Sequence, residues 1–130
     1  ACDFLVKTLR RKSLVFMISD FQATSLDKPL GKLSRKHESI ALRVTDPLEL
    51  ELPRAGRVVM VDPETGLGTT VNTNNPALRQ AYALHAAAQK DFVGSLFKKH
   101  GLDVADLRTD LDPLPSLHQL LRRRKRKRSA

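Results

Sequence analysis

The chain of 130 residues has a single cysteine and no long apolar stretch. With Cys2 alone, no disulfide can form within the chain and no cysteine-based metal cluster can be built. No apolar run approaches the roughly 20 residues that a membrane-spanning helix needs. No basic start leads into an apolar stretch with a small-residue cleavage site, as a signal peptide would require. These absences favour a reducing, cytoplasmic setting.

Motifs for catalysis and metal binding are also missing. The four histidines lie far apart and form no His-Glu-x-x-His motif. No Gly-x-Ser-x-Gly motif of serine hydrolases occurs, and Gly66-Leu67-Gly68 lies in a predicted hairpin rather than between a strand and a helix. Ser19 and a histidine could be combined into a Ser-His-Asp set, but no spacing supports it. We therefore expect no enzymatic activity and assign no catalytic residue and no cofactor.

Positive charge is concentrated at the C-terminal end. The net charge is +9, from 23 Lys and Arg against 14 Asp and Glu. Seven basic residues follow one another without a break: Arg122, Arg123, Arg124, Lys125, Arg126, Lys127 and Arg128. Without these seven, 16 of the 23 basic residues remain against 14 acidic ones, a net charge of +2. The basic character is therefore predicted to belong to a tail over residues 122–130.

The tail has two interpretations. A basic run can neutralise phosphates or bind an anionic membrane surface, which makes all seven residues candidates for anion binding. It contains no aromatic residue on which bases could stack. The alternative is a solvated, disordered tail without a ligand.

The first half of the chain has the pattern of a β-α-β unit. Residues 13–20, SLVFMISD, contain five consecutive apolar residues, as in a strand covered on both faces. Thr24 and Asp27 have capping-box spacing and predict a helix to about Lys36. Residues 39–45, SIALRVT, form the second predicted strand, and the crossover is expected to be right-handed. Residues 1–12 resemble the end of a helix.

The second half adds a hairpin, a long helix, a third strand and a last helix. Residues 57–61 and 69–73 are two short strands around an Asp-Pro-Glu-Thr-Gly turn. Asn75-Pro76 begins a helix that ends near His100-Gly101. Residues 104–108 form the third main strand, and Asp112-Pro113 begins a helix that merges into the tail. We predict one α/β domain over residues 1–121, with an open, mainly parallel sheet, helices on both faces and an inserted β-hairpin.

Three predicted strands are followed by an aspartate. Asp20, Asp46 and Asp110 would lie at the carboxyl edge of the sheet, where open parallel sheets bind ligands. Carboxylate oxygens are suited to Mg²⁺ or Ca²⁺. Asp46 precedes proline in a common turn pair, and Asp110 could accept hydrogen bonds from loop amides. Asp20 has no obvious capping role and is therefore the candidate metal ligand.

At SLVFMISDF the chain begins to resemble a bacterial family, the domain-of-unknown-function family fifty-eight. Its members are similar to divergent von Willebrand factor A domains and are often encoded beside MoxR-type AAA ATPases. The resemblance continues through four further segments, SIALRVTDPLELELP, VDPETG with the hairpin after it, NPALRQAYA, and LRTDLDPLPSLHQLLRRRKRKR.

The resemblance implies a protein-protein interaction or scaffolding module, with a MoxR-type AAA ATPase as candidate partner. In von Willebrand A-like domains three loops supply the metal-ion-dependent adhesion site. Asp20 matches the aspartate of the third loop, whereas the first two loops would precede residue 1. The resemblance therefore predicts the C-terminal half of the domain with an incomplete site, which would bind Mg²⁺ only with the upstream half supplied. A longer form would carry the family's upstream membrane-anchoring segments.

Two other functions stay open, and one feature of the sheet bears on partners. The tail could bind nucleic acid or an anionic membrane without sequence specificity, and a small hydrolase could use Asp20.

The neighbour that residues 13–20 would have in the full sheet is absent here. We therefore expect self-association through this edge, or cover by residues 1–12.

Overall fold

The computed structural model describes residues 2–23, 25–62 and 65–129. Its elements are α1 (Cys2–Thr8), β1 (Leu14–Ser19), α2 (Asp27–Lys36), β2 (Glu38–Thr45), α3 (Pro47–Leu50), β3 (Arg57–Val61), β4 (Gly68–Asn72), α4 (Pro76–Lys99), β5 (Asp103–Arg108) and α5 (Leu114–Ser129).

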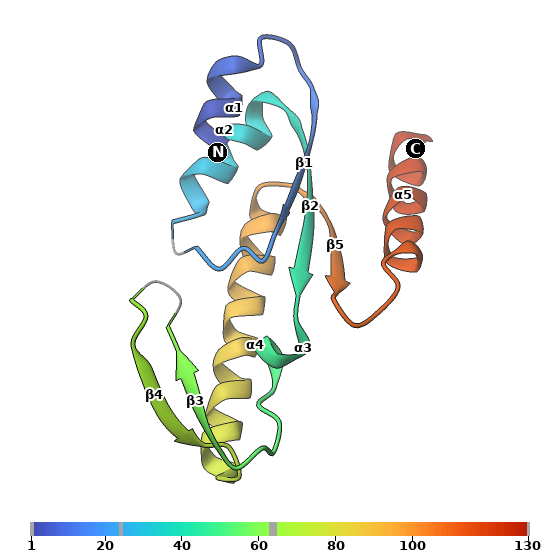
Figure 1. Cartoon of the computed structure of the whole chain (residues 1–130). Coiled ribbons are helices and arrows are strands. Elements are labelled where there is room, and N and C mark those ends of the chain that lie inside the picture. Colours follow the sequence, from blue (N-terminus) through green and yellow to red (C-terminus); the bar gives the residue numbers. More distant parts are fainter. Residues whose placement is uncertain (1, 24, 63–64, 130) are drawn as a thin grey trace.

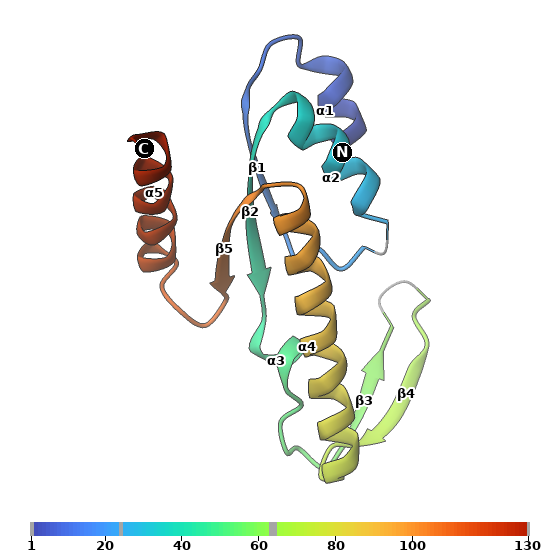
Figure 2. The same cartoon turned by 180° about the vertical axis from the view of Figure 1, so that it is seen from behind.

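The main sheet contains three parallel strands in the order β1-β2-β5. Phe16 pairs with Ile40 in its register, and Leu42 pairs with Ala105. The sheet lies with α4 on one side of β5 and α5 on the other (Figures 1 and 2). The predicted parallel α/β sheet and its helices on both faces are thus confirmed.

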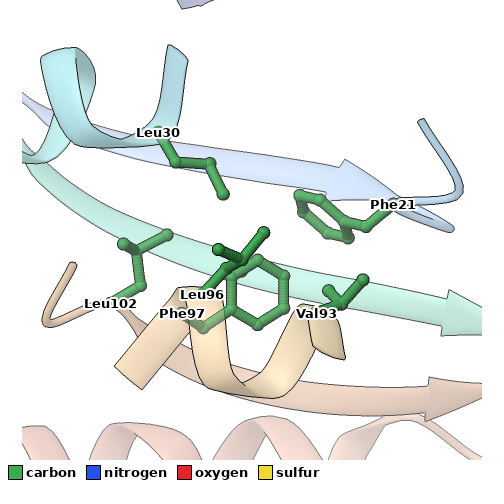
Figure 3. Packing of buried hydrophobic residues seen from close by; sticks show 7 residues of the cluster. Phe21, Leu30, Val93, Leu96, Phe97 and Leu102 are labelled. Carbon is green, nitrogen blue, oxygen red and sulfur yellow. The ribbon is translucent and has the colours of Figure 1, made fainter. Parts of the chain in front are cut away.

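One face of the sheet carries the larger core. Residues from β2, α2, α4, the loop after β1 and the turn after α4 converge there: Phe21, Leu30, Ala41, Val93, Leu96, Phe97 and Leu102. Their side chains point toward one another between α4, α2 and the sheet (Figure 3). The rings of Phe21 and Phe97 meet edge to face, with centroids 4.8 Å apart.

The opposite face is covered only in part. Ile40 and Leu42 of β2 and Ala105 of β5 pack against Leu120 of α5. The side chains of β1 on this face stay exposed, with Leu14 at 46%, Phe16 at 51% and Ile18 at 68%. The prediction that this strand is covered on both faces is wrong, because α5 packs over β2 and β5 and does not reach β1.

The predicted hairpin is confirmed as a second, antiparallel sheet of β3 and β4, separate from the main one. Pro63 and Glu64 of its predicted turn lie outside the described residues. The helix signals at the start and end of α4 are confirmed as well. Asn75 caps α4 by accepting a hydrogen bond from the Ala77 amide at 3.0 Å, and Gly101 has the left-handed φ of 66°.

Thr24 of the predicted α2 capping box lies outside the described residues. Leu26 precedes the helix and provides no side-chain cap. Asp27 instead reaches across to α4, where its carboxylate accepts hydrogen bonds from Lys99 at 2.9 Å and lies 2.7 Å from Nε2 of His100. α2 is therefore fixed at this end by a contact to α4.

Candidate functional site

A cleft of about 260 Å³ opens at the carboxyl end of β1 and β2, between α3 and α4. Its polar lining comes from four parts of the chain: Asp20 and Gln22 after β1, Arg43 and Thr45 of β2, Glu49 of α3, and Tyr82, His85, Gln89 and Lys90 of α4. This is the edge at which open parallel sheets bind their ligands. Of the three aspartates predicted to meet here, only Asp20 lines the cleft.

A short turn after β1 fixes Asp20 at the rim. Its Oδ1 accepts hydrogen bonds from the Ser19 hydroxyl at 3.2 Å and the Gln22 amide at 3.3 Å. Phe21 has a φ of 56°, a left-handed conformation that is unfavourable for a large side chain. The conformation persists because the Phe21 ring is buried against Phe97, and this anchor leaves Asp20 exposed to solvent.

The wall and floor of the cleft are joined by hydrogen bonds between elements. The Tyr82 hydroxyl donates to the Leu48 carbonyl at 2.9 Å, which ties α4 to α3. Burial, and then the nearby carboxylate of Glu49, raise the pKa of Tyr82. Glu49 also accepts a hydrogen bond from the Gln22 side chain at 3.3 Å. The loop after β1, α3 and α4 therefore hold one another in place around Asp20.

Arg43 forms the floor. It is buried on β2, and its Nε donates to Asp106 Oδ1 on β5 at 2.6 Å. Its Nη1 donates to the Lys90 carbonyl of α4 at 3.1 Å. These two contacts occupy the guanidinium in linking the sheet to α4, a structural role.

Asp46 and Asp110 have structural roles instead of facing the cleft. Asp46 caps α3 by accepting a hydrogen bond from the Leu48 amide at 2.8 Å, and it accepts a second from the Thr109 hydroxyl at 3.2 Å. Asp110 pairs with Arg108 at 2.8 Å, and this hydrogen bond lowers the pKa of Asp110. Neither carboxylate lines the cleft beside Asp20.

The residues around Asp20 do not by themselves fit a divalent cation. Among the residues that the structure describes, no group of three or more His, Cys, Asp and Glu is arranged to hold a metal ion. Ser19 and Gln22 are the polar groups hydrogen-bonded to Asp20, and Mg²⁺ requires near-octahedral oxygen coordination. Within the described ranges, no hydrogen bond joins Ser19 to a histidine, as a hydrolytic triad would need.

Sequence reasoning missed most of the cleft wall. Tyr82, His85 and Gln89 follow one another at helical spacing, so they share a face of α4. His85 is exposed and lines the cleft. The only sign of this polar face in the sequence is the placement of polar residues within an otherwise alanine-rich helix. Glu49 and Gln22 carried no such signal, because Glu49 reaches the cleft from α3 and Gln22 from the loop after β1.

The basic residues do not form a free tail. α5 continues to Ser129, and Arg124 within it is buried against the sheet. Arg124 pairs with Glu38 of β2 and, at 2.5 Å, with Asp103 of β5. The prediction that the last helix ends in a solvated tail is wrong, because carboxylates at the start of two strands attract the cations and extend the helix.

The other basic residues divide into two groups. Lys127 pairs with Asp103 at 2.6 Å, and Arg123 donates to the Val104 carbonyl at 3.0 Å. Arg122, Lys125 and Arg126 point into solvent without a protein partner within the part of the chain that is described. Only these three of the predicted anion-binding residues are therefore unoccupied there. The side chain of Arg128 lies outside the described structure.

None of the helices within the described ranges is long and apolar enough to cross a membrane.

Comparison with known proteins places the chain in a family. The family model described as "Protein of unknown function DUF58" matches residues 1–92. The chain is 35% identical over 127 residues to the uncharacterized protein MAV169 of Mycobacterium avium, covering 97% of this chain and 75% of that protein. It is equally similar to the uncharacterized proteins Rv1480 of Mycobacterium tuberculosis and Mb1516 of Mycobacterium bovis, but spans 40% of their length. No solved structure matches it. The chain therefore belongs to the DUF58 family, whose function is unknown.

Proposed function

We propose that this chain is a protein-interaction module that binds its partner at the cleft around Asp20. The observation that carries the proposal is an exposed carboxylate fixed at the carboxyl edge of a parallel sheet by a strained, buried anchor, Phe21. Strained backbone persists where the surrounding structure holds it, and such positions cluster at ligand-binding sites. The function proposed is binding and not catalysis, because Ser19 interacts with Asp20 and the Phe21 amide.

The chemistry of the cleft favours a partner with a basic side chain. Asp20 and Glu49 line it from opposite elements, and both are joined to Gln22. A lysine or arginine of the partner could pair with either carboxylate, whereas Lys90 of α4 could pair with an acidic group. Members of the family that the chain resembles are often encoded beside MoxR-type AAA ATPases, so an ATPase of this type from the same organism is the partner to test.

The test is a binding titration of the chain against that purified ATPase by biolayer interferometry. Asp20→Lys and Glu49→Lys place a cation where the partner's cation would bind, so each is expected to raise the Kd about tenfold or more. Asp110→Lys is the matched control, since it reverses a carboxylate of the loop after β5 that does not line the cleft. Lack of binding, or equal loss with the control, would refute the proposal.

A second function is supported by α5, whose exposed cations could bind an anionic polymer or membrane. Arg122, Lys125 and Arg126 are three and four residues apart, so they share one face of the helix. Three phosphate contacts predict a slope of log K against log salt of about −3, whereas seven would give about −6. Fluorescence anisotropy with duplex DNA of two unrelated sequences measures this slope. A steeper slope, or a strong preference for one sequence, would contradict it.

A further inference from the structure

A second hollow, of about 490 Å³, lies between α2 and the C-terminal end of α4. The two helices lie side by side there (Figures 1 and 2). Among the described residues, this α2–α4 hollow shares none with the lining of the cleft around Asp20. Its charged lining consists of four cations and one carboxylate: Lys28, Lys32, Arg35, Lys99 and Asp27. The hollow is therefore a separate and predominantly positive surface.

The floor of the α2–α4 hollow is formed where α2 has no side chain. A Cβ at Gly31 would lie 2.8 Å from Cε1 of His100, so the imidazole ring lies directly against the backbone of α2. Gly31 is buried, and the His100 side chain is only 16% exposed. The end of α4 is thus fixed against α2, and the cations around the hollow are carried by two regular helices.

The one carboxylate of the hollow is already occupied by the two residues of α4. Both oxygens of Asp27 accept hydrogen bonds from Lys99 at 2.9 Å, and Oδ1 lies 2.7 Å from Nε2 of His100. No ion pair between Asp27 and a cation of α2 is present in the described part of the chain. Asp27 therefore leaves the charge of the α2 cations uncompensated.

The cations of α2 form a row without adequate counter-charges. Lys28, Lys32 and Arg35 are three and four residues apart on one face, and like charges at this spacing destabilise a helix. Lys28 and Arg35 have no side-chain partner among the described residues. Lys32 pairs with Asp3 of α1, which was expected to cover the edge of β1 but packs against α2. Both side chains of that pair are more than half exposed, so it contributes little.

We propose that the α2–α4 hollow binds a diphosphate group, held by Lys28, Lys32 and Arg35. Phosphate oxygens accept two parallel hydrogen bonds from an arginine and single ones from lysines. Lys28 and Arg35 are separated by about 10 Å along the helix axis, so two linked phosphates bridge them better than one. The bound anion would also relieve the repulsion within the row.

The rest of the ligand contributes little to this recognition. Among the described residues that line the hollow there is no Phe, Tyr or Trp on which a base could stack. The cations surround a concave site of a size typical of small ligands, which favours a compact anion over a nucleic-acid duplex. Inorganic pyrophosphate is therefore a sufficient probe.

The first experiment is isothermal titration with pyrophosphate at about 0.15 M salt, which screens distant charges. The wild-type chain is expected to bind with a Kd of about 1 mM or below, and orthophosphate about tenfold more weakly. Lys28→Glu and Arg35→Glu should each raise the Kd for pyrophosphate about tenfold or more. Lys98→Glu is the matched control, since Lys98 is an exposed lysine beside Lys99 that does not line the hollow.

Three results of this titration would overturn the proposal. They are a wild-type chain that does not bind pyrophosphate, equal affinity for pyrophosphate and orthophosphate, and a loss in Lys98→Glu as large as in Arg35→Glu. Vesicles containing phosphatidylglycerol form a separate arm. If they bind the chain through Arg35 while pyrophosphate does not, the site recognises a lipid surface and not a diphosphate.

The second experiment locates the anion by amide chemical-shift mapping of the ¹⁵N-labelled chain. Pyrophosphate should shift the amide signals of Gly31, Lys32 and His100 and leave those of α5 unchanged. If the largest shifts fall on α5, the anion binds the basic helix and the proposal is wrong. Neither experiment involves the cleft or the ATPase, so the result is independent of the proposed partner binding.

Discussion

Arg124→Ala should destabilise the fold more than any other single change in the basic run. Arg124 is 10% exposed at its side chain, and its partners Asp103 and Glu38 are 18% and 37% exposed. A hydrogen bond to a charged group contributes about 1.5–3 kcal/mol, and breaking a fully buried ion pair costs about 3–5 kcal/mol. Water screens Glu38 in part, and Asp103 keeps Lys127 as a partner. We therefore expect a loss of about 2 kcal/mol in the free energy of unfolding.

Urea unfolding followed by circular dichroism measures this loss. With the slope usual for a small domain, about 2 kcal/mol lowers the midpoint by about 1 M. Lys125→Ala is the matched control, because Lys125 is an exposed neighbour on the same helix, and a change within about 0.5 kcal/mol is expected. An Arg124→Ala variant as stable as Lys125→Ala would show that the ion pairs do not hold α5 on the sheet.

Three other predictions concern the helices and Asp20. A Cβ at Gly31 would lie 2.8 Å from the His100 ring, so Gly31→Ala should destabilise the chain by about 1 kcal/mol or more, as calorimetry can measure. A Cβ at Gly94 would have no neighbouring atom within 4 Å, so Gly94→Ala should stabilise α4 by up to about 1 kcal/mol. A change in the free energy of unfolding of the same sign for both variants would refute this reasoning. Hydrogen bonds from Lys99, and then from His100, lower the pKa of Asp27 from its ordinary 3.8. The ionised Asp27 therefore contributes fully to the stability of the fold above that pH, and this contribution is lost as the pH falls through the lower pKa of the folded state. The stability difference between wild type and Asp27→Asn should accordingly vanish on acidification, and a difference that grows would contradict the assignment. Isothermal titration should find Mg²⁺ binding no tighter than about millimolar, roughly −4 kcal/mol, and little effect of Asp20→Asn on stability. A micromolar site abolished by that substitution would mean that the chain completes its own metal site.

The sequence was sufficient to predict the parallel sheet because local patterns define its strands and helix ends. Apolar runs marked β1 and β2, and Asn75 with Gly101 marked the two ends of α4. The exposure of Phe16 could not be predicted, since it depends on which strands α5 covers. The helical state of the basic run was hidden for a similar reason. Arg124 finds Glu38 at a separation of 86 residues, and no local pattern reports so distant a partner.

The candidate site was predictable only where a motif position marked it. Asp20 directly follows the apolar run of β1, so its place at the end of a strand can be seen in the sequence. Asp46 and Asp110 also follow strands, but their roles differ. Asp46 caps α3, and Asp110 pairs with Arg108. Tyr82 and Glu49 reach the cleft from other elements, which a single sequence does not bring together.

The docking of α5 links anion binding to the coverage of the sheet. The carboxylates of Glu38 and Asp103 already neutralise Arg124, and they would compete with any polyanion that engages the entire basic run. Such a ligand would have to release α5, which uncovers Ile40 and Leu42. By reciprocity, whatever fastens α5 to the sheet lowers the affinity of the full run for polyanions. Ionic strength acts on both equilibria at once, because salt weakens the ion pairs and the phosphate contacts alike.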